Sequence, residues 1–158
     1  MLAAGPTAAS TSYDDLVQLD NSVSAQPAVS TSSMVSHDTG SNAVTNANLA
    51  YFHSFDCTGC RTITVAVQAV VIEGSPSTVG PQNAAVAVNE NCQACQTFAY
   101  THHYVFSPHH AVTFDPDTNQ KLAYIQSGID WVAHSNMDFP TMSTRLDQLS
   151  WGFCTTVQ

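Results

Sequence analysis

The chain has 158 residues, a net charge of −9 and a charged fraction of 9%, compared with about 25% in typical soluble domains. Its three Lys and Arg residues are too few to neutralise the phosphates of a nucleic acid or an anionic membrane surface, so neither partner is expected. No apolar stretch approaches the ~20 residues of a transmembrane helix, so no membrane span is expected either. Because its polarity comes from uncharged side chains, the composition indicates an extracellular or cell-surface protein.

Residues 1–46 are rich in Ser, Thr and Ala and contain no Lys or Arg. This composition predicts an N-terminal tail or donor segment, followed by a single β-rich domain with a C-terminal helix pair over 47–158. Ordering a polar tail costs about 1–2 kcal/mol per residue in backbone entropy, so an ordered tail needs a surface to lie on. Strand addition to the exposed sheet edge of a neighbouring chain would supply it. We therefore expect a homo-oligomer or polymer held together through this N-terminal segment.

An internal repeat follows the predicted tail. Residues 48–72 and 83–107 align without gaps at an offset of 35 residues. Each copy predicts a strand, a C-x-x-C turn and a second strand rich in Val, Ile and Thr. Gly59 fits a tight hairpin turn, because such turns require positive φ. We therefore expect two antiparallel hairpins in a four-stranded sheet, with His53 opposite Thr64.

The C-terminal third changes to helical periodicity. Asp115 and Pro116 form a helix start, with aspartate as N-cap and proline at the first helical position. A second helix is expected to open at Phe139 and Pro140. The apolar stripes of the two helices are Leu122, Ile125, Ile129 and Val132, then Met142, Leu146, Leu149 and Phe153. The predicted fold class is α+β: an antiparallel β-sheet of two repeated C-x-x-C hairpins, a C-terminal αα-hairpin that covers one sheet face, and an extended N-terminal tail.

Four of the five cysteines form two C-x-x-C pairs, Cys57 with Cys60 and Cys92 with Cys95. We expect structural disulfides, given the predicted compartment, with all three connectivities open. A four-thiolate zinc site is the alternative, but the gap of 31 residues between the pairs exceeds the ~15–20 usual in zinc ribbons. A redox role is disfavoured, because redox pairs normally lie at a helix N-terminus. The remaining Cys154 is expected to be buried as a small hydrophobe or bonded to another chain.

Two histidine pairs also suggest a metal site, namely His102, His103, His109 and His110. Adjacent strand residues point to opposite faces, so only one member of each pair can face a given site. We therefore expect no metal or other cofactor, with zinc or another transition metal as the alternative. The sequence contains no H-E-x-x-H, G-x-S-x-G or phosphate-binding motif, so we do not expect an enzyme.

Four strings carry a resemblance to a known family: NLAY, CTGCRT, VAVQAV and PQNAAVAVNENC. Over residues 46–153 the chain resembles a poorly characterised family of bacterial secreted proteins, mainly of the actinobacterial type. Its members share the doubled C-x-x-C strand repeat and a C-terminal helical segment, and some are associated with peptide zinc metalloproteases. The resemblance implies secretion but no activity, and it assigns no metal role to the histidines.

Two functions remain. The first is a non-enzymatic extracellular structural protein, a self-assembling subunit of a filament or surface layer stabilised by disulfides and by contacts of the N-terminal segment. The low charge and the odd number of cysteines favour it. The second is a secreted metal-binding or protease-associated accessory module, which the Cys and His content and the family resemblance favour.

Overall fold

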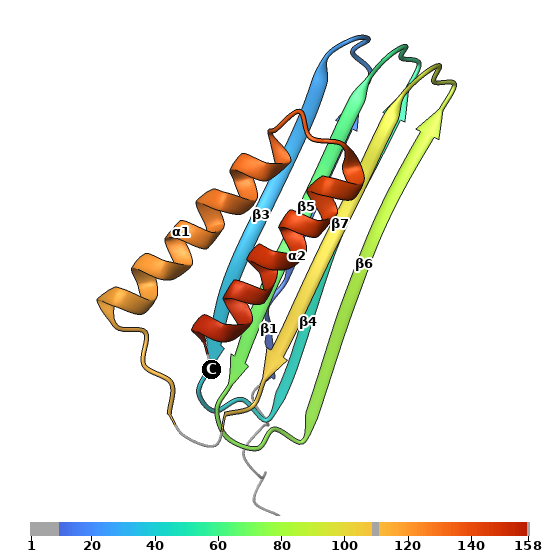
Figure 1. The fold of residues 1–158 in the computed structure, drawn as a ribbon. Coiled ribbons are helices and arrows are strands. Elements are labelled where there is room, and N and C mark those ends of the chain that lie inside the picture. The colour runs from blue at the N-terminus through green and yellow to red at the C-terminus, as the bar shows by residue number, and fades with distance from the viewer. Residues whose placement is uncertain (1–9, 109–110, 158) are drawn as a thin grey trace, which may run out of the picture.

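The computed structural model describes residues 10–108 and 111–157, which form seven strands and two helices (Figure 1). In chain order these elements are β1 Ser10–Ser12, β2 Asp15–Asn21, β3 Pro27–Asp38, β4 Ala43–Phe55, β5 Arg61–Ile72, β6 Thr78–Glu90, β7 Gln96–Phe106, α1 Pro116–Ala133 and α2 Phe139–Thr156. No helix in the described part of the chain is long and apolar enough to span a membrane.

The strands form two sheets in which every pairing is parallel. In one sheet, β1 and β2 follow each other along one edge of β4, and β6 pairs with the other edge. In the other sheet, β5 lies between β3 and β7. The chain therefore winds through three successive layers, each with one strand path in each sheet and a turn between them. We call these layers rungs: β1–β2 with β3, β4 with β5, and β6 with β7.

The expected antiparallel sheet is wrong. The strands on either side of each C-x-x-C turn do not pair with each other, because they lie in opposite sheets as a β-arch. Each strand instead pairs with the equivalent strand of the next rung, so the 35-residue offset becomes the register: Asn48 lies beside Asn83, and Thr62 beside Thr97. In a hairpin and in an arch alike, every second residue of a strand faces the core. The alternation of apolar and polar residues therefore cannot distinguish the two arrangements.

The expected extended N-terminal tail is also wrong for its described part, residues 10–46, whereas residues 1–9 lie outside the described residues. Residues Ser10–Asp38 form the first rung, whose strands pair with β4 and β5 of the same chain. Their backbone groups thus form hydrogen bonds within the chain. These strands do not need the surface of another chain, which is expected from the sequence. β4 begins at Ala43, before the expected domain boundary at residue 47.

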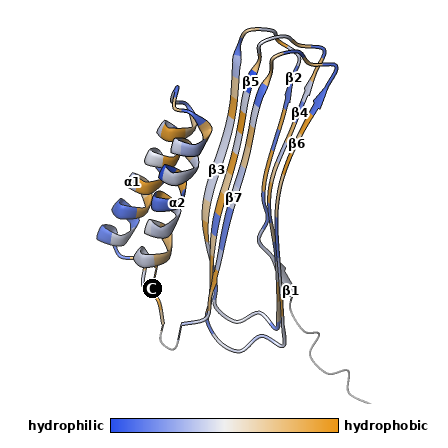
Figure 2. Cartoon of the chain, turned by 45° about the vertical axis from the view of Figure 1, so that its right-hand side comes forward, coloured by the Kyte–Doolittle hydropathy of each residue, from blue (hydrophilic) through white to orange (hydrophobic). Residues whose placement is uncertain are grey.

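The two helices pack on the sheet of β3, β5 and β7, which we call the covered sheet (Figure 2). One face of β5, including Ile63, Val65 and Val67, lies in a core with the apolar stripes of both helices. The expected αα-hairpin and its cover of one sheet face are thus present. Asp115 caps α1 through Thr118 N, 2.7 Å away, and Asp138 caps α2 in the same way.

The space between the two sheets is partly polar. The other face of β5 turns Thr62, Thr64 and Gln68 toward the second sheet, and all three are fully buried. Gln68 accepts a hydrogen bond of 3.1 Å from Asn46 of β4. Apolar contacts lie between these groups, such as Val17 with Ala50 and Ala66. Two of these polar groups also bond to the first rung, since Thr62 accepts from Asn21 and Gln68 donates to Tyr13 O, whereas the Thr64 hydroxyl has no hydrogen-bond partner among the described residues.

Candidate functional site

The two C-x-x-C turns have the same backbone conformation and lie one above the other. The residue before the second cysteine has positive φ in both, 65° at Gly59 and 55° at Ala94. The turns hydrogen bond to each other, since Gly59 N donates to Gln93 O at 2.8 Å and Gln93 N donates to Cys57 O at 3.0 Å. Gly59 has the positive φ that the sequence predicts, but in an arch between two sheets and not in the predicted hairpin turn. This stacking places one pair of cysteines directly above the other.

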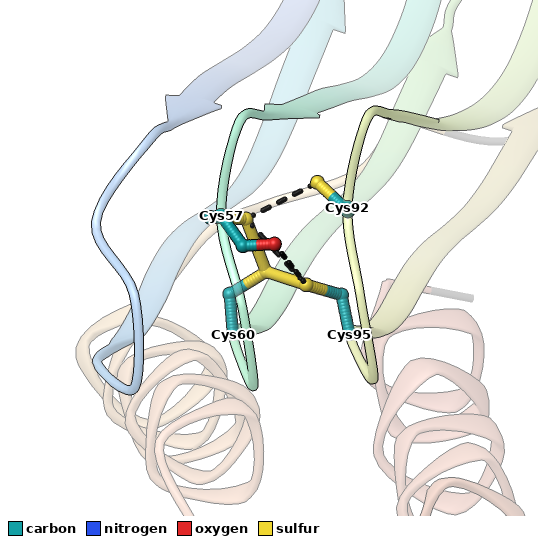
Figure 3. Close-up of side chains that lie close together, drawn as sticks. All are labelled: Cys57, Cys60, Cys92 and Cys95. Atoms are coloured by element: carbon teal, nitrogen blue, oxygen red, sulfur yellow. Dashed lines mark hydrogen bonds between the residues drawn. A yellow bond between two sulfur atoms is a disulfide. The ribbon is translucent and has the colours of Figure 1, made fainter.

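The four cysteine sulfurs converge on one point (Figure 3). Cys57, Cys60, Cys92 and Cys95 each contribute one sulfur, and all four sulfurs lie within 4.8 Å of one another. Cys57 and Cys60 are 2% and 1% exposed, whereas the pair on the third rung is partly exposed. The cluster therefore joins the buried second rung to the more exposed third one.

The contacts within the cluster allow more than one chemistry. Cys60 lies within bonding distance of both Cys57 and Cys95, and one sulfur can form only one disulfide. The Cys57 sulfur is also 3.2 Å from that of Cys92. Two rung-to-rung disulfides, Cys57–Cys92 and Cys60–Cys95, would use all four sulfurs. The cysteines are thus close enough for disulfides, while their oxidation stays a prediction.

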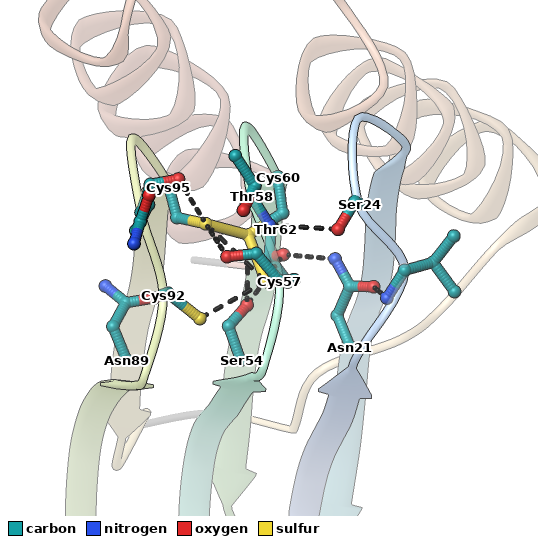
Figure 4. Close-up of a disulfide and its surroundings, with 12 residues drawn as sticks. Asn21, Ser24, Ser54, Cys57, Thr58, Cys60, Thr62, Asn89, Cys92 and Cys95 are labelled. Atoms are coloured by element: carbon teal, nitrogen blue, oxygen red, sulfur yellow. Dashed lines mark hydrogen bonds between the residues drawn. A yellow bond between two sulfur atoms is a disulfide. The ribbon is translucent and has the colours of Figure 1, made fainter.

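Hydroxyl and amide groups surround the buried side of the cluster (Figure 4). The Cys60 sulfur is 3.9 Å from Ser54 Oγ, which in turn is 3.4 Å from Thr62 Oγ1. Asn21 of the first rung donates to that same threonine oxygen at 2.9 Å. The turn of the first rung carries no cysteine, and its Ser24 accepts a hydrogen bond from Thr58 N at 3.0 Å. The site therefore belongs to the second and third rungs alone.

A ladder of polar side chains crosses all three rungs between the sheets. Asp15, Asn48 and Asn83 occupy equivalent positions on β2, β4 and β6. Asn48 Nδ2 donates to Asn83 Oδ1 at 3.0 Å. At the first rung, Asp15 is 4% exposed, and its Oδ2 has no hydrogen-bond partner among the described residues. Burial raises the pKa of this carboxyl, and a hydrogen bond from Ser32 offsets part of that effect.

His102 and His103, the two described members of the predicted histidine site, do not point toward a common site. His103 points between the sheets, where its ring contacts the Asn46 side chain. His102 points the other way, 3.2 Å from Tyr100 Oη and stacked on Tyr104. Burial lowers the pKa of both rings. Within residues 10–108 and 111–157, no histidine joins a group of three or more possible metal ligands. The other pair, His109 and His110, lies outside the described residues.

Cys154 lies in the last turns of α2 and is 4% exposed. Burial raises the pKa of its thiol, which keeps the sulfur protonated and unreactive at neutral pH. This position agrees with the interpretation as a small buried hydrophobe. A bond to another chain would first require this end of α2 to leave the core.

The third rung ends the stack with open strand edges. Nearly every residue of β6 is exposed, and none of the described residues pairs with the outer edge of β6 or β7. The outer edges of β2 and β3 are open in the same sense at the opposite end of the stack. The sequence predicts an exposed sheet edge but not its position, because the predicted fold lacks the first rung. Pairing strands by their offset would have found this rung, since β2 precedes β4 at an offset of 33 residues (Asp15 to Asn48).

Comparison with known proteins adds no relative. No protein-family model, no curated protein and no solved structure matches this chain, so the resemblance to a secreted bacterial family stays a prediction.

Proposed function

We propose that this chain is a non-enzymatic structural protein that assembles head to tail, with the first rung of one copy adding to the third rung of the next. The observation that carries the proposal is a parallel stack with open strand edges at both ends. The extracellular location inferred from composition stays a prediction, and the assembly does not depend on it.

The open edges fit continued parallel pairing. β6 and β7 offer edges of 13 and 11 residues, each with a row of outward N–H and C=O groups. Long exposed edges of this kind invite pairing with another chain. All strands of one sheet run in the same direction, so β2 and β3 of a second copy can pair with β6 and β7 as they pair with β4 and β5 in their own chain.

The polar ladder supports the choice of a second copy as the partner. In a head-to-tail stack, Asp15 of one copy would lie in register with Asn83 of the next. The side-chain amide of that Asn83 could then donate a hydrogen bond to the buried Asp15 Oδ2, which has no partner among the described residues. A buried acceptor without a hydrogen bond destabilises a protein by about 1–3 kcal/mol. A hydrogen bond gained on assembly would remove this cost and so favour the assembled state.

The helix pair sets the shape of such an assembly. Three strand spacings of ~4.8 Å give a rise of about 14 Å per copy. Two helices packed side by side need roughly 20 Å, which exceeds that rise. Because α1 packs on β3 and α2 on β7, helices of successive copies would collide in a straight stack. Successive copies must therefore rotate about the stack axis, and we expect a twisted filament.

The alternative function, a secreted metal-binding or protease-associated accessory module, gains support for metal binding alone. That support is the four-sulfur cluster.

A charge exchange across the proposed interface tests the assembly. Wild type is expected to form large species in sedimentation velocity at pH 8, where carboxylates are ionised. Asn83→Asp would place a second carboxylate beside Asp15 of the next copy, so we expect assembly to need at least ~10-fold more protein, as one like-charge contact of about 1.4 kcal/mol implies. Adding Asp15→Asn to the same chain should restore assembly.

Asn136→Asp is the matched control. It adds the same charge at an exposed position between the helices, and it should assemble like wild type. A wild-type protein that stays monomeric up to ~100 μM would refute the proposal, since a specific interface should associate well below that concentration. So would an Asn83→Asp variant that assembles like wild type.

A further inference from the structure

We propose that Cys57, Cys60, Cys92 and Cys95 bind one zinc ion as four thiolates. The juxtaposition that carries this inference is two C-x-x-C turns of identical conformation, stacked so that their four sulfurs lie within 4.8 Å of one another. The inference is independent of the assembly proposed above, and either can fail alone.

The four sulfurs are close enough together to share one tetrahedral ion. Zinc–sulfur bonds of ~2.3 Å place the ligands of a tetrahedron about 3.8 Å apart. The Cys57 sulfur is 3.2 Å from that of Cys92 and 3.5 Å from that of Cys95. The Cys60 sulfur is closer than this to the sulfurs of Cys57 and Cys95, so a single ion at the centre would also require the Cys60 side chain to move away from both, while the backbone of the two turns stays in place.

The fold removes the spacing argument against zinc. The gap of 31 residues between the C-x-x-C pairs is long for a zinc ribbon, where one short loop must bring two turns together. Here the gap is filled by β5 and β6, and their pairing with β7 and β4 brings the turns into register. Gln96 N donates a backbone hydrogen bond of 2.8 Å to Cys60 O, so the same register continues past the second cysteine of each turn. The strands therefore supply the loop closure before any metal binds.

The ligand set selects the metal. Four soft thiolates in tetrahedral array favour zinc over calcium or magnesium, which prefer oxygen. Binding converts four thiols and Zn²⁺ into a complex of charge −2 and releases four protons to solvent. On the buried side, the Ser54 hydroxyl is placed to donate to the Cys60 thiolate. Glu90 and Asp56 flank the two turns in sequence, but the sulfurs alone form the cluster.

Zinc and disulfides exclude each other at this site. Forming Cys57–Cys92 and Cys60–Cys95 would remove four electrons and four protons from the thiols and would need an external oxidant. A chain with both disulfides has no thiolate left for zinc. The zinc form and the disulfide form therefore differ in mass by one zinc ion, and the metal-free reduced chain is four hydrogens heavier than the disulfide form.

Metal analysis of the full chain distinguishes these states. The protein is purified under reducing, oxygen-free conditions, supplied with zinc chloride and passed through a desalting column. Native mass spectrometry and elemental analysis should give one zinc per chain. Cobalt(II) in place of zinc should give the intense visible absorption of a tetrahedral thiolate site. Thiol titration of the folded zinc form should find the four cysteines protected until a strong chelator is added.

Cys92→Ser and Cys154→Ser are the matched variants. Cys92 is partly exposed, so its replacement should leave the fold intact. Loss of a residue that merely hydrogen bonds to a zinc ligand can weaken metal binding by up to ~100-fold, and loss of the ligand Cys92 itself should weaken zinc binding by more than that. Cys154→Ser should bind zinc like wild type. A reduced wild-type protein that retains no zinc while all four thiols react freely would overturn the proposal, whatever the variants do. So would a protein that carries two disulfides and binds no zinc after reduction.

Discussion

At the residue scale, the turns of the three rungs differ most clearly in one left-handed position. Gly59 occupies it in the second rung with φ of 65°, whereas Ala25 and Ala94 occupy it in the first and third rungs with φ of 56° and 55°. An L-residue in this conformation costs about 1–2 kcal/mol, and glycine avoids that cost. Two alanines are therefore strained at a turn position that glycine occupies without strain in the second rung.

Exchanging these residues should change stability in opposite directions. Ala94→Gly should raise the free energy of unfolding by up to ~1 kcal/mol, and Gly59→Ala should lower it by about 1 kcal/mol. Urea unfolding curves measure both. Ala87→Gly, in the middle of β6, is the control and should lower stability by roughly 0.5–1 kcal/mol. Loss of stability in Ala94→Gly comparable to that of the control would contradict the turn assignment.

Asp15 gives a pH-dependent prediction. Its pKa in the folded chain is raised by burial above the unfolded value of 3.8. The folded state therefore holds this proton more tightly, so the stability gained from it is present at low pH and is lost as pH rises through the folded pKa. Asp15→Asn should raise the unfolding midpoint at neutral pH, and it should remove this part of the pH dependence. A variant less stable than wild type at neutral pH would show that the ionised carboxylate is satisfied in the monomer.

At the scale of elements, the helices follow from local sequence and the strand pairing does not. The Asp115 cap and the apolar stripe of α1 depend on residues three or four positions apart, so the sequence predicts them correctly. Strand pairing depends on contacts about 35 residues apart, where a hairpin and an arch show the same alternation. β5 carries the missing signal: its run VAVQAVVI is nearly continuous in apolar residues, as is typical of a central strand in a parallel sheet, and the structure buries every residue of this strand after Arg61.

The helix pair should contribute much of the stability through the covered sheet. Ile129 of α1 is 1% exposed in the core against this sheet, and Tyr124 of the same helix is 79% exposed. Ile129→Ala should cost about 2–5 kcal/mol in the free energy of unfolding. Tyr124→Ala should change it by no more than ~0.5 kcal/mol. Similar losses in the two variants, measured by chemical denaturation, would place the helix differently on the sheet.

At the scale of the whole molecule, the candidate sites follow from stacking rather than from any single motif. Cys57 and Cys92 were recognised in the sequence as equivalent repeat positions, but only parallel stacking makes equivalent positions neighbours. The ladder from Asp15 to Asn83 escaped sequence reasoning because the first rung lacks cysteines. Its polar composition also resembles that of a disordered tail. A rung of this kind cannot bury an apolar face by itself, and it becomes ordered through the rungs beside it.

The account rests on the claim that the open third rung receives the first rung of another copy. Helical reconstruction of the native assembly by electron cryomicroscopy tests this most directly. The account predicts a twisted filament with strands stacked ~4.8 Å apart along its axis and an axial rise of about 14 Å per subunit, three strand spacings. A protein that remains monomeric at every concentration, or a filament whose rise is not close to three strand spacings, would contradict it.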